Sequence, residues 1–272
     1  MASTEPPVST AELACLDGRT GPSAHAVIPA TDEGFLRGFG AFEVIRVYDG
    51  QPFALAEHLD RLERSAAGLR LEGGVPRAEL EREAPELLAA RGGAGFDGCL
   101  RIILTRGGRR LLLTEPLPSG AERTRLGYVT YAPTRVLDGI KSLSYGANIL
   151  ATELAHERGY DEALLVTPHG RVLEAPTSSL FWVDSAGALL TPPLDDHILA
   201  SITRDRVMAL VDVEERSTTP EDLEGADEAF LASTTREVQP VAAIEDRELP
   251  GDGTRTGEAA EALRRHIQAS LG

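Results

Sequence analysis

GIKSLSY, at residues 139–145, contains Lys141, the only lysine of the chain. All other positively charged side chains are arginines, although Lys and Arg together number 27. A coding bias toward arginine explains why lysine is scarce, but it does not explain why this one remains. A guanidinium stays protonated, whereas a lysine amine can lose its proton and attack a carbonyl carbon. Lys141 is therefore a candidate for Schiff-base chemistry, and an ordinary surface cation is the alternative.

The composition is that of a globular protein without an obvious polyanionic partner. The chain has 272 residues, of which 42% are hydrophobic, enough for one large or two modest domains. Its net charge of -16 argues against nucleic acid or an anionic membrane as the main partner. An anionic cofactor would therefore need local donors. Cys15 and Cys99 stand apart with no CxxC spacing, so we expect no metal site.

Targeting signals are missing from the sequence pattern. Residues 1–7 have neither a basic segment nor an apolar stretch of the kind that a signal peptide needs. No apolar run reaches the roughly 18 residues of a membrane span. We therefore expect a cytoplasmic protein that crosses no membrane.

The chain divides at Pro116-Leu117-Pro118, where prolines break the pattern of strands and helices. We expect a disordered leader at 1–12, a small N-terminal α/β domain at 13–118 and a larger C-terminal domain at 119–272. Strands and helices alternate irregularly, which favours a mixed α/β fold rather than repeated βαβ units. Periodicity predicts strands at 40–48, 98–105, 162–166 and 229–232, and helices at about 58–69, 77–91, 144–158, 202–211 and 256–271.

Around the lysine, the second half of the chain carries groups that suit a phosphate-bearing aldehyde. Ser201, Ile202 and Thr203 stand where a helix begins, and its free amides favour a phosphate. Residues 233–235 (STT) form a hydroxyl cluster after an apolar strand. Glu174 ends a short apolar run and could keep a pyridine nitrogen protonated. Taken singly, each has a simpler explanation, namely a helix cap, a turn and a solvated carboxylate.

These segments occur in an order that resembles a known family. The matching pieces are GFGAFEVIRVYDG (38–50), HLDRL (58–62), KSLSY (141–145), GYDEA (159–163), GRVLEAPTSSLF (170–181), TPP (191–193), ITR (202–204) and FLASTTREVQPV (230–241). The chain resembles the fold-type IV pyridoxal-phosphate enzymes, also called aminotransferase class IV, over about residues 14–260. That group holds branched-chain and D-amino-acid aminotransferases, (R)-amine transaminases and aminodeoxychorismate lyases.

The resemblance implies a two-domain fold like that of D-amino-acid aminotransferase, a homodimer, and pyridoxal 5'-phosphate as cofactor. Position by position, Lys141 matches the Schiff-base lysine, and Glu174 matches the carboxylate that pairs with the pyridinium nitrogen. Leu199 matches the leucine against the ring, and Tyr145 a tyrosine that bonds the ring hydroxyl. The positions that match phosphate ligands are Arg61, Ile202, Thr203 and Thr234.

Two positions depart from the family pattern. The family usually has Asn where Ser179 stands and Gly where Ser201 precedes Ile202. The first change puts a hydrogen bond behind the cofactor in question, and the second could tighten the approach to the phosphate. Neither position affects the lysine.

The substrate is left open by the sequence. The candidate substrate-binding residues are Phe42, Val44, Arg101, Arg109, Arg110 and Thr235. An arginine is the natural partner of a substrate carboxylate, but any of these arginines could equally be a surface cation. We expect an aminotransferase that moves an amino group between a branched-chain or D-amino acid and a 2-keto acid. Alternatives are aminodeoxychorismate lyase, an (R)-amine transaminase and a catalytically silent binding protein.

Overall fold

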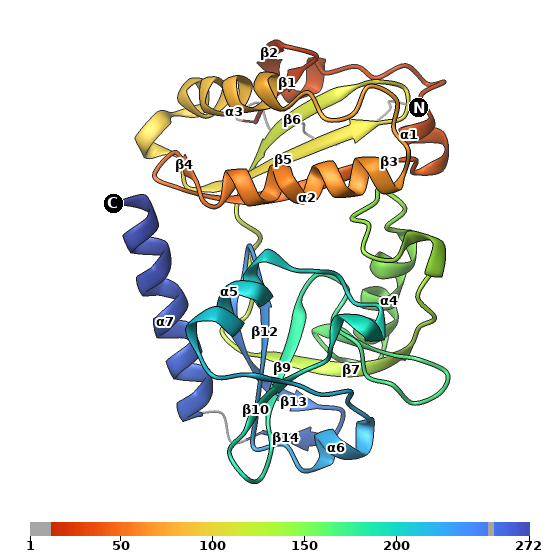
Figure 1. The fold of residues 1–272 in the computed structure, drawn as a ribbon, viewed down its shortest axis with the longest axis vertical. Coiled ribbons are helices and arrows are strands. Elements are labelled where there is room, and N and C mark those ends of the chain that lie inside the picture. Colours follow the sequence, from red (N-terminus) through yellow and green to blue (C-terminus); the bar gives the residue numbers. More distant parts are fainter. Residues whose placement is uncertain (1–11, 250–252) are drawn as a thin grey trace, which may run out of the picture. The chain divides into compact units, whose positions relative to one another are not determined.

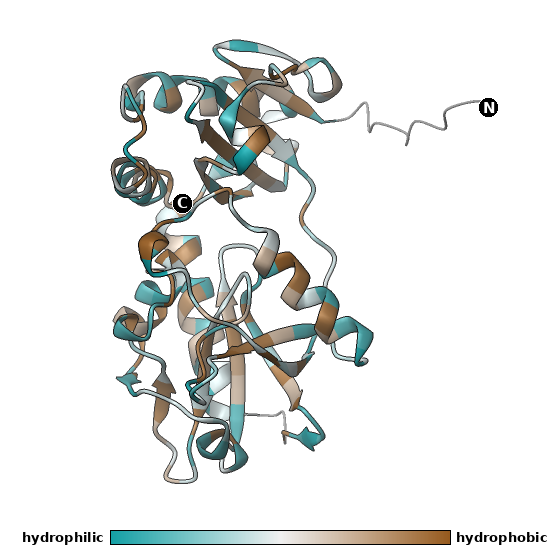
Figure 2. Cartoon of the chain, turned by 90° about the vertical axis from the view of Figure 1, so that its right-hand side faces the viewer, coloured by the Kyte–Doolittle hydropathy of each residue, from teal (hydrophilic) through white to brown (hydrophobic). Residues whose placement is uncertain are grey.

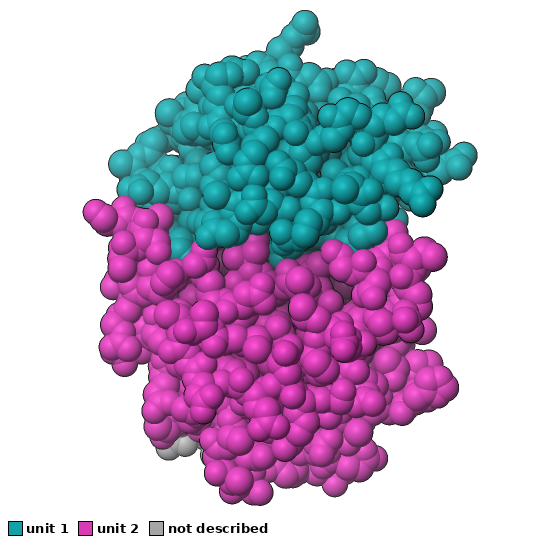
Figure 3. Space-filling view, in the orientation of Figure 1, with its two compact units in different colours: residues 1–118, 140–144 teal, residues 119–139, 145–272 magenta. Residues whose placement is uncertain are grey.

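The computed structural model describes residues 12–249 and 253–272 (Figure 1). The expected leader, residues 1–12, lies outside the described residues except for Glu12. Backbone contacts divide the chain into two units (Figure 3). Unit 1 comprises residues 1–118 and 140–144, and unit 2 comprises residues 119–139 and 145–272.

This division differs from the expected one at residues 140–144, which we had placed in the second domain. The segment lies along the strand Gly40–Tyr48 of unit 1. Leu143 N donates to Gly40 O at 2.8 Å, and Phe42 N donates to Lys141 O at 3.1 Å. Backbone pairing of residues distant in sequence, which no local pattern reveals, therefore places Lys141 in unit 1.

Unit 1 is a sheet with helices. Its strands are β1 (Leu13–Leu16), β2 (Arg19–Pro22), β3 (Gly40–Tyr48), β4 (Gln51–Pro52), β5 (Gly98–Thr105) and β6 (Arg110–Glu115). Its helices are α1 (Glu33–Arg37), α2 (Leu55–Gly68) and α3 (Arg77–Arg91), with 3-10 turns at Ser23–His25 and Gly93–Gly95. The strand order is β2-β1-β6-β5-β3-β4, and every pairing is antiparallel.

The two faces of this sheet differ in burial. Glu43, Ile102 and Leu112 are cross-strand partners on one face, and all are buried beneath 1% exposure. Helix α2 packs on this face, where its Arg61 donates a hydrogen bond to Glu43. On the other face, Val44, Arg101 and Leu113 are partners and remain half-buried. The second face therefore offers the accessible surface of the sheet.

Unit 2 is a larger mixed sheet. Its strands are β7 (Thr124–Thr130), β8 (Glu162–Val166), β9 (Ser179–Val183), β10 (Leu189–Thr191), β11 (Glu214–Glu215), β12 (Glu228–Ser233), β13 (Glu237–Ile244) and β14 (Arg247–Glu248). Its helices are α4 (Gly146–Glu157), α5 (Ile202–Leu210), α6 (Pro220–Glu224) and α7 (Thr254–Leu271), with 3-10 turns at Arg135–Leu137 and Leu194–Asp196. The order is β11-β10-β9-β12-β13-β7-β8, with β14 beside β13.

The core of unit 2 lies on both sides of this sheet. One apolar cluster gathers Trp182, Leu231 and Val241, and a smaller one sets Ala151 and Ala155 of α4 against the strand residues Ala163 and Leu165. Hydrophobic residues are concentrated on the strands and polar residues on the turns (Figure 2). The contacts of Ala151 and Ala155 with Ala163 and Leu165 hold α4 against β8.

The predicted mixed α/β class is confirmed, as are strand β5 and helix α3 at their expected bounds. Strand β13 was not predicted. Pro240 argues against a central strand, yet β13 pairs with β12 on one side and β7 on the other, with an irregularity in register just after Pro240. Among residues 12–249 and 253–272, no helix is long and apolar enough to cross a membrane.

Candidate functional site

Backbone hydrogen bonds fix the position of Lys141, and its side-chain amine lies over an aromatic ring. Its amide N donates to the Ser65 hydroxyl of α2 at 3.1 Å. Its Nζ lies 4.5 Å from the centroid of the Phe42 ring on β3. The contact is of the cation–π type and places the amine beside the flat side of an apolar group.

A buried carboxylate lies on the opposite side of β3. Glu43 accepts hydrogen bonds from Arg61 Nε at 2.7 Å and Nη2 at 2.6 Å, and it pairs with His58 Nδ1 at 2.7 Å. His58 and Arg61 stand one turn apart on α2, so both reach the same strand residue. Glu43 is 0% exposed, and the two partners are 1% and 4% exposed. The fork of Arg61 is thus fixed in orientation.

Electrostatics in this cluster set the charge of each group. Burial would raise the pKa of Glu43, but the hydrogen bonds from Arg61 and His58 outweigh it and lower the pKa to about 2. Burial lowers the pKa of His58 below its ordinary value, against the raising effect of Glu43. The positive charges of Arg61 and Lys141 add to this lowering. The cluster therefore holds an ionised Glu43 and a neutral imidazole at neutral pH.

Sequence reasoning missed the roles of Glu43 and His58. A signal was present, because alternation along β3 puts Glu43 on the same face as the apolar Ala41 and Ile45. A carboxylate on a buried face requires a cation. His58 and Arg61, three residues apart on the predicted helix, were the available partners in the quoted HLDRL motif.

In unit 2, helix α5 begins where the sequence predicted a phosphate cradle. Ser201 caps it by accepting a hydrogen bond from Arg204 N at 3.3 Å. Ile202 and Thr203 are the first two helical residues, and amides at this end have no acceptor within the helix. Thr203 is 8% exposed. The arrangement suits an anion at the α5 N-terminus.

Glu174 belongs to a short segment that pairs with β8, where Leu165 N donates to Glu174 O at 3.0 Å. Its Oε1 accepts a hydrogen bond from Leu199 N at 3.0 Å, and its Oε2 accepts one from the Ser179 hydroxyl at 3.4 Å. The serine that replaces the usual asparagine thus still reaches the carboxylate, at a long distance. Glu174 also raises the pKa of Tyr131, after the larger effect of burial.

The segment after Glu174 is tied to helix α4. Pro176 O accepts hydrogen bonds from the Tyr145 hydroxyl at 2.5 Å and from Asn148 Nδ2 at 3.0 Å. Tyr145 stands at the cap position of α4, and Asn148 lies in its first turn. Both side chains therefore fix the backbone two residues beyond Glu174, and the proposed bond of Tyr145 to a ring hydroxyl stays a prediction.

Thr234 and Thr235 lie in the turn between β12 and β13 and are half-buried. Arg236 N donates to the Ser233 hydroxyl at 3.3 Å, and Glu237 has a left-handed φ of 54°. A non-glycine residue at positive φ is strained, so contacts elsewhere must hold this turn.

The three arginines that the sequence suggested as substrate ligands all have carboxylate partners. Arg101 Nε lies 2.9 Å from Glu115, and its guanidinium carbon lies 5.6 Å from the Phe42 ring centroid. Arg110 forms two bonds to buried Glu83, at 2.7 and 2.8 Å. Arg109 pairs with Asp17 at 2.8 Å. Arg101 alone among the three lies beside Phe42, on the half-buried sheet face.

The predicted residues are distributed over both units. Unit 1 holds Lys141, Arg61, Phe42, Val44, Arg101, Arg109 and Arg110. Unit 2 holds Tyr145, Glu174, Leu199, Ile202, Thr203, Thr234 and Thr235. In the described part of the chain, no cluster of His, Cys, Asp and Glu has the arrangement of a metal site.

Comparisons with known proteins agree on one family. Residues 40–244 match the family model for amino-transferase class IV. A D-alanine aminotransferase of Bacillus licheniformis is 32% identical, over 94% of each chain. An aminodeoxychorismate lyase of Bacillus subtilis is 29% identical, over 92% of this chain and 91% of that protein. The structure of a branched-chain aminotransferase of Thermoproteus uzoniensis with norvaline aligns with a TM-score of 0.85 and 30% identity, over 95% of each chain.

Proposed function

Because the chain belongs to the aminotransferase class IV family, whose members depend on pyridoxal phosphate, we propose that it transfers an amino group between an amino acid and a 2-keto acid. The observation that carries this proposal is Lys141, the only amine-bearing side chain, with its Nζ over the Phe42 ring. The predicted family, fold-type IV class and cofactor are confirmed by the family match and the aligned structures.

The donor groups fit pyridoxal phosphate. A primary amine, a paired carboxylate for the ring nitrogen, an arginine and a capped helix start are all present. The cofactor, when bound, supplies an electron sink that acidifies the Cα hydrogen of the amino substrate. Lys141 would bond the cofactor carbonyl carbon and, once displaced by substrate, move the Cα proton.

The phosphate ligands that we propose are Arg61, the amides of Ile202 and Thr203, and the hydroxyls of Thr203 and Thr234. A chain of net charge -16 repels the dianion, so local donors must hold it. Glu43 keeps the fork of Arg61 in one orientation by two of its donors. An oriented guanidinium loses less conformational entropy when it binds phosphate.

Glu174 is proposed as the partner of the ring nitrogen. Leu199 N and the Ser179 hydroxyl both donate to it, and each hydrogen bond favours the ionised carboxylate. An ionised carboxylate keeps the pyridine nitrogen protonated, which strengthens electron withdrawal from the substrate. Leu199, whose backbone holds Glu174, is proposed to pack against the ring.

The substrate class that we propose is an amino acid with an aliphatic side chain. The half-buried face of the unit 1 sheet carries Val44 and Leu113, with Arg101 between them in the cross-strand row. Apolar neighbours suit an aliphatic side chain, and the arginine suits a carboxylate. Because Arg101 alone among the three candidate arginines lies beside Phe42, we favour it over Arg109 and Arg110. Thr235 is proposed as a further donor to substrate.

We also propose that the enzyme is a homodimer. Helix α4 exposes Ile149, Leu150 and Leu154 at 55%, 60% and 41%. Leu150 and Leu154 lie one helical turn apart, so they share a face that a second copy could cover. Light scattering of the purified chain measures the mass, and a monomer at micromolar concentration would contradict this part of the proposal.

The test of the activity is a substrate panel on the cofactor-loaded protein. D- and L-amino acids, (R)-1-phenylethylamine and aminodeoxychorismate are each added, and cofactor absorbance is followed. We expect an aliphatic amino acid to convert the cofactor, and a 2-keto acid to restore it. Pyruvate released from aminodeoxychorismate without an added keto acid would assign the lyase activity. A cofactor absorbance that no amine changes would identify a silent binding protein.

A further inference from the structure

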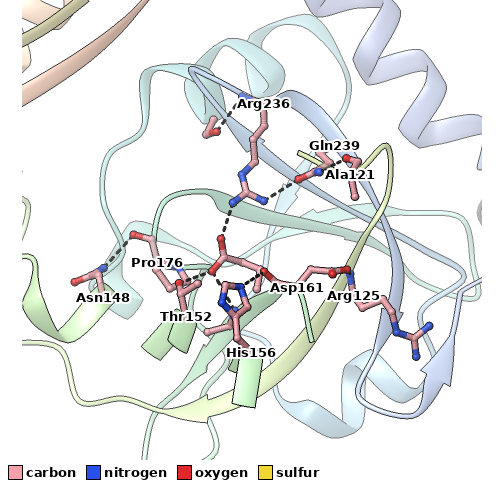
Figure 4. Close-up of polar contacts among 12 residues, drawn as sticks. Ala121, Arg125, Asn148, Thr152, His156, Asp161, Pro176, Arg236 and Gln239 are labelled. Atoms are coloured by element: carbon pink, nitrogen blue, oxygen red, sulfur yellow. Dashed lines mark hydrogen bonds and ion pairs between the residues drawn. The ribbon is translucent and has the colours of Figure 1, made fainter. Parts of the chain in front are cut away.

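The turn that carries Thr234 is held by an ion pair between half-buried Arg236 and buried Glu162, which the proposed chemistry does not use. Arg236 Nη2 donates to Glu162 Oε2 at 2.5 Å, and its Nη1 donates to Gln239 Oε1 at 2.8 Å. Figure 4 shows Arg236 reaching down from the turn, with Gln239 beside it. Gln239 in turn donates to Ala121 O at 2.6 Å. The guanidinium therefore links the turn to two other segments of unit 2.

Glu162 is almost completely enclosed. It is 3% exposed, and its Oε1 accepts hydrogen bonds from the Thr152 hydroxyl at 2.6 Å and from Ala163 N at 3.1 Å. A carboxylate in this environment requires a cation nearby. Glu162 begins β8, whereas the turn joins β12 and β13, so Arg236 reaches across β7. The pair thus fixes the turn relative to a distant strand.

Helix α4 connects this pair to the segment after Glu174. Asn148 and Thr152 lie one helical turn apart, on the same side of α4 (Figure 4). Asn148 holds Pro176 O, two residues beyond Glu174, and Thr152 holds Glu162. One helix face therefore sets the position of the Glu174 segment and, through Arg236, that of the Thr234 turn.

We propose that Arg236 is a positioning residue, whose ion pair with Glu162 holds residues 233–237 so that Thr234 is presented to the cofactor phosphate. The inference rests on the proposed function, because it assumes that Thr234 is a phosphate ligand. The strained φ of Glu237 supplies the reason for such a restraint, since a turn in this conformation relaxes when its tertiary contacts are lost.

The experiment compares two ligands that differ only in the phosphate. Full-length chain freed of cofactor is titrated with pyridoxal phosphate and with pyridoxal, read by absorbance. We expect Arg236→Met and Glu162→Gln each to weaken pyridoxal phosphate binding by about 3- to 10-fold, the value of one neutral hydrogen bond. The affinity for pyridoxal should not change. The double variant should lose no more affinity for pyridoxal phosphate than the single variant that binds it more weakly, because both changes break the same ion pair.

The matched control is Arg125→Met, which removes an arginine of the same sheet whose partner Glu248 is 67% exposed. It should leave both affinities unchanged. Arg236→Lys should recover part of the lost affinity, because it restores the charge beside Glu162. Melting curves establish that every variant is folded at the temperature of the titration.

Three results would overturn the inference. Unchanged affinity for pyridoxal phosphate in both variants would show that the pair does not position the turn. Equal losses for the two ligands would assign a general structural role. Loss in Arg236→Met with full affinity in Glu162→Gln would make Arg236 a direct ligand of the phosphate. A wild-type chain that binds neither aldehyde would instead refute the proposed function itself.

Discussion

Replacing Glu43 by Gln removes the charge at the centre of the buried cluster while keeping its shape. The folded chain lowers the pKa of Glu43 from 4.5 to about 2. A change of that size corresponds to roughly 3 kcal/mol in favour of the ionised carboxylate. The variant also leaves Arg61, which is 4% exposed, without its carboxylate. We therefore expect the free energy of unfolding of the cofactor-free protein to fall by about 3 kcal/mol at pH 7.

The sign of the pH dependence follows from the direction of the pKa change. Because the folded pKa of Glu43 is lowered, its stabilisation is complete above about pH 4.5 and is lost as pH falls toward 2. The difference between wild type and Glu43→Gln should therefore be largest near neutral pH and shrink below pH 4.5. Buried His58 causes a second loss of stability in the wild type below pH 6.5. Its pKa is lowered in the folded chain, so the imidazole takes up a proton more readily in the unfolded chain.

The assay is thermal unfolding of cofactor-free wild type and Glu43→Gln at pH 7 and at pH 3. At pH 7 the midpoint should fall by roughly 6–12 °C, since 1 kcal/mol corresponds to about 2–4 °C for a chain of this size. Cofactor is omitted because ligand binding adds stability of its own. The control is Glu81→Gln, at an exposed i,i+4 pair with Arg77, which should leave the midpoint nearly unchanged. Equal midpoints for wild type and Glu43→Gln at pH 7 would refute the assigned ion pair.

Three further predictions concern the cofactor. Borohydride reduction should attach the cofactor covalently to Lys141. A peptide map with the label only at the N-terminal amine would contradict this. Lys141→Ala and Lys141→Arg should both lack turnover. Glu174→Gln should retain the cofactor but slow proton abstraction by roughly 10²-fold, so near-normal turnover would place the carboxylate elsewhere. Arg61→Ala should weaken cofactor binding more than Thr203→Ala or Thr234→Ala, because a charged hydrogen bond is worth about 1.5–3 kcal/mol and a neutral one about 0.5–1.5; titration of the three variants checks this order.

Local sequence determined the family, the cofactor and the secondary structure wherever the periodicity was clean. The lone lysine and the order of the short motifs pointed to Lys141 and Glu174 without any knowledge of contacts. The helix at about residues 58–69, observed as α2, was predicted because Leu59, Leu62, Ala66 and Leu69 recur at helical spacing. The serine cap of α5 was likewise predicted, since a cap depends only on residues within one turn.

Elements whose form depends on partners were missed. Pro240 suggests a break in the chain, but β12 and β7 pair on both sides of β13 and hold it as a strand. Residues 140–144 pair along β3, a strand that lies about a hundred positions earlier. Strand pairing between distant segments is decided by the packing of whole units, so no local window contains it.

The same distinction separates the proposed catalytic groups from the ion pairs that the structure contains. The residue type sufficed to propose the reactive amine, because lysine alone has an amine in its side chain. By contrast, Glu43 meets Arg61 across 18 positions, Arg110 meets Glu83 across 27, and Glu162 meets Arg236 across 74. Any carboxylate could pair with any arginine in a chain that has 43 acidic residues. The register of the strands and the packing of the helices on the sheets decide which ion pairs form, because a buried charge is tolerated only where an oppositely charged partner lies within reach.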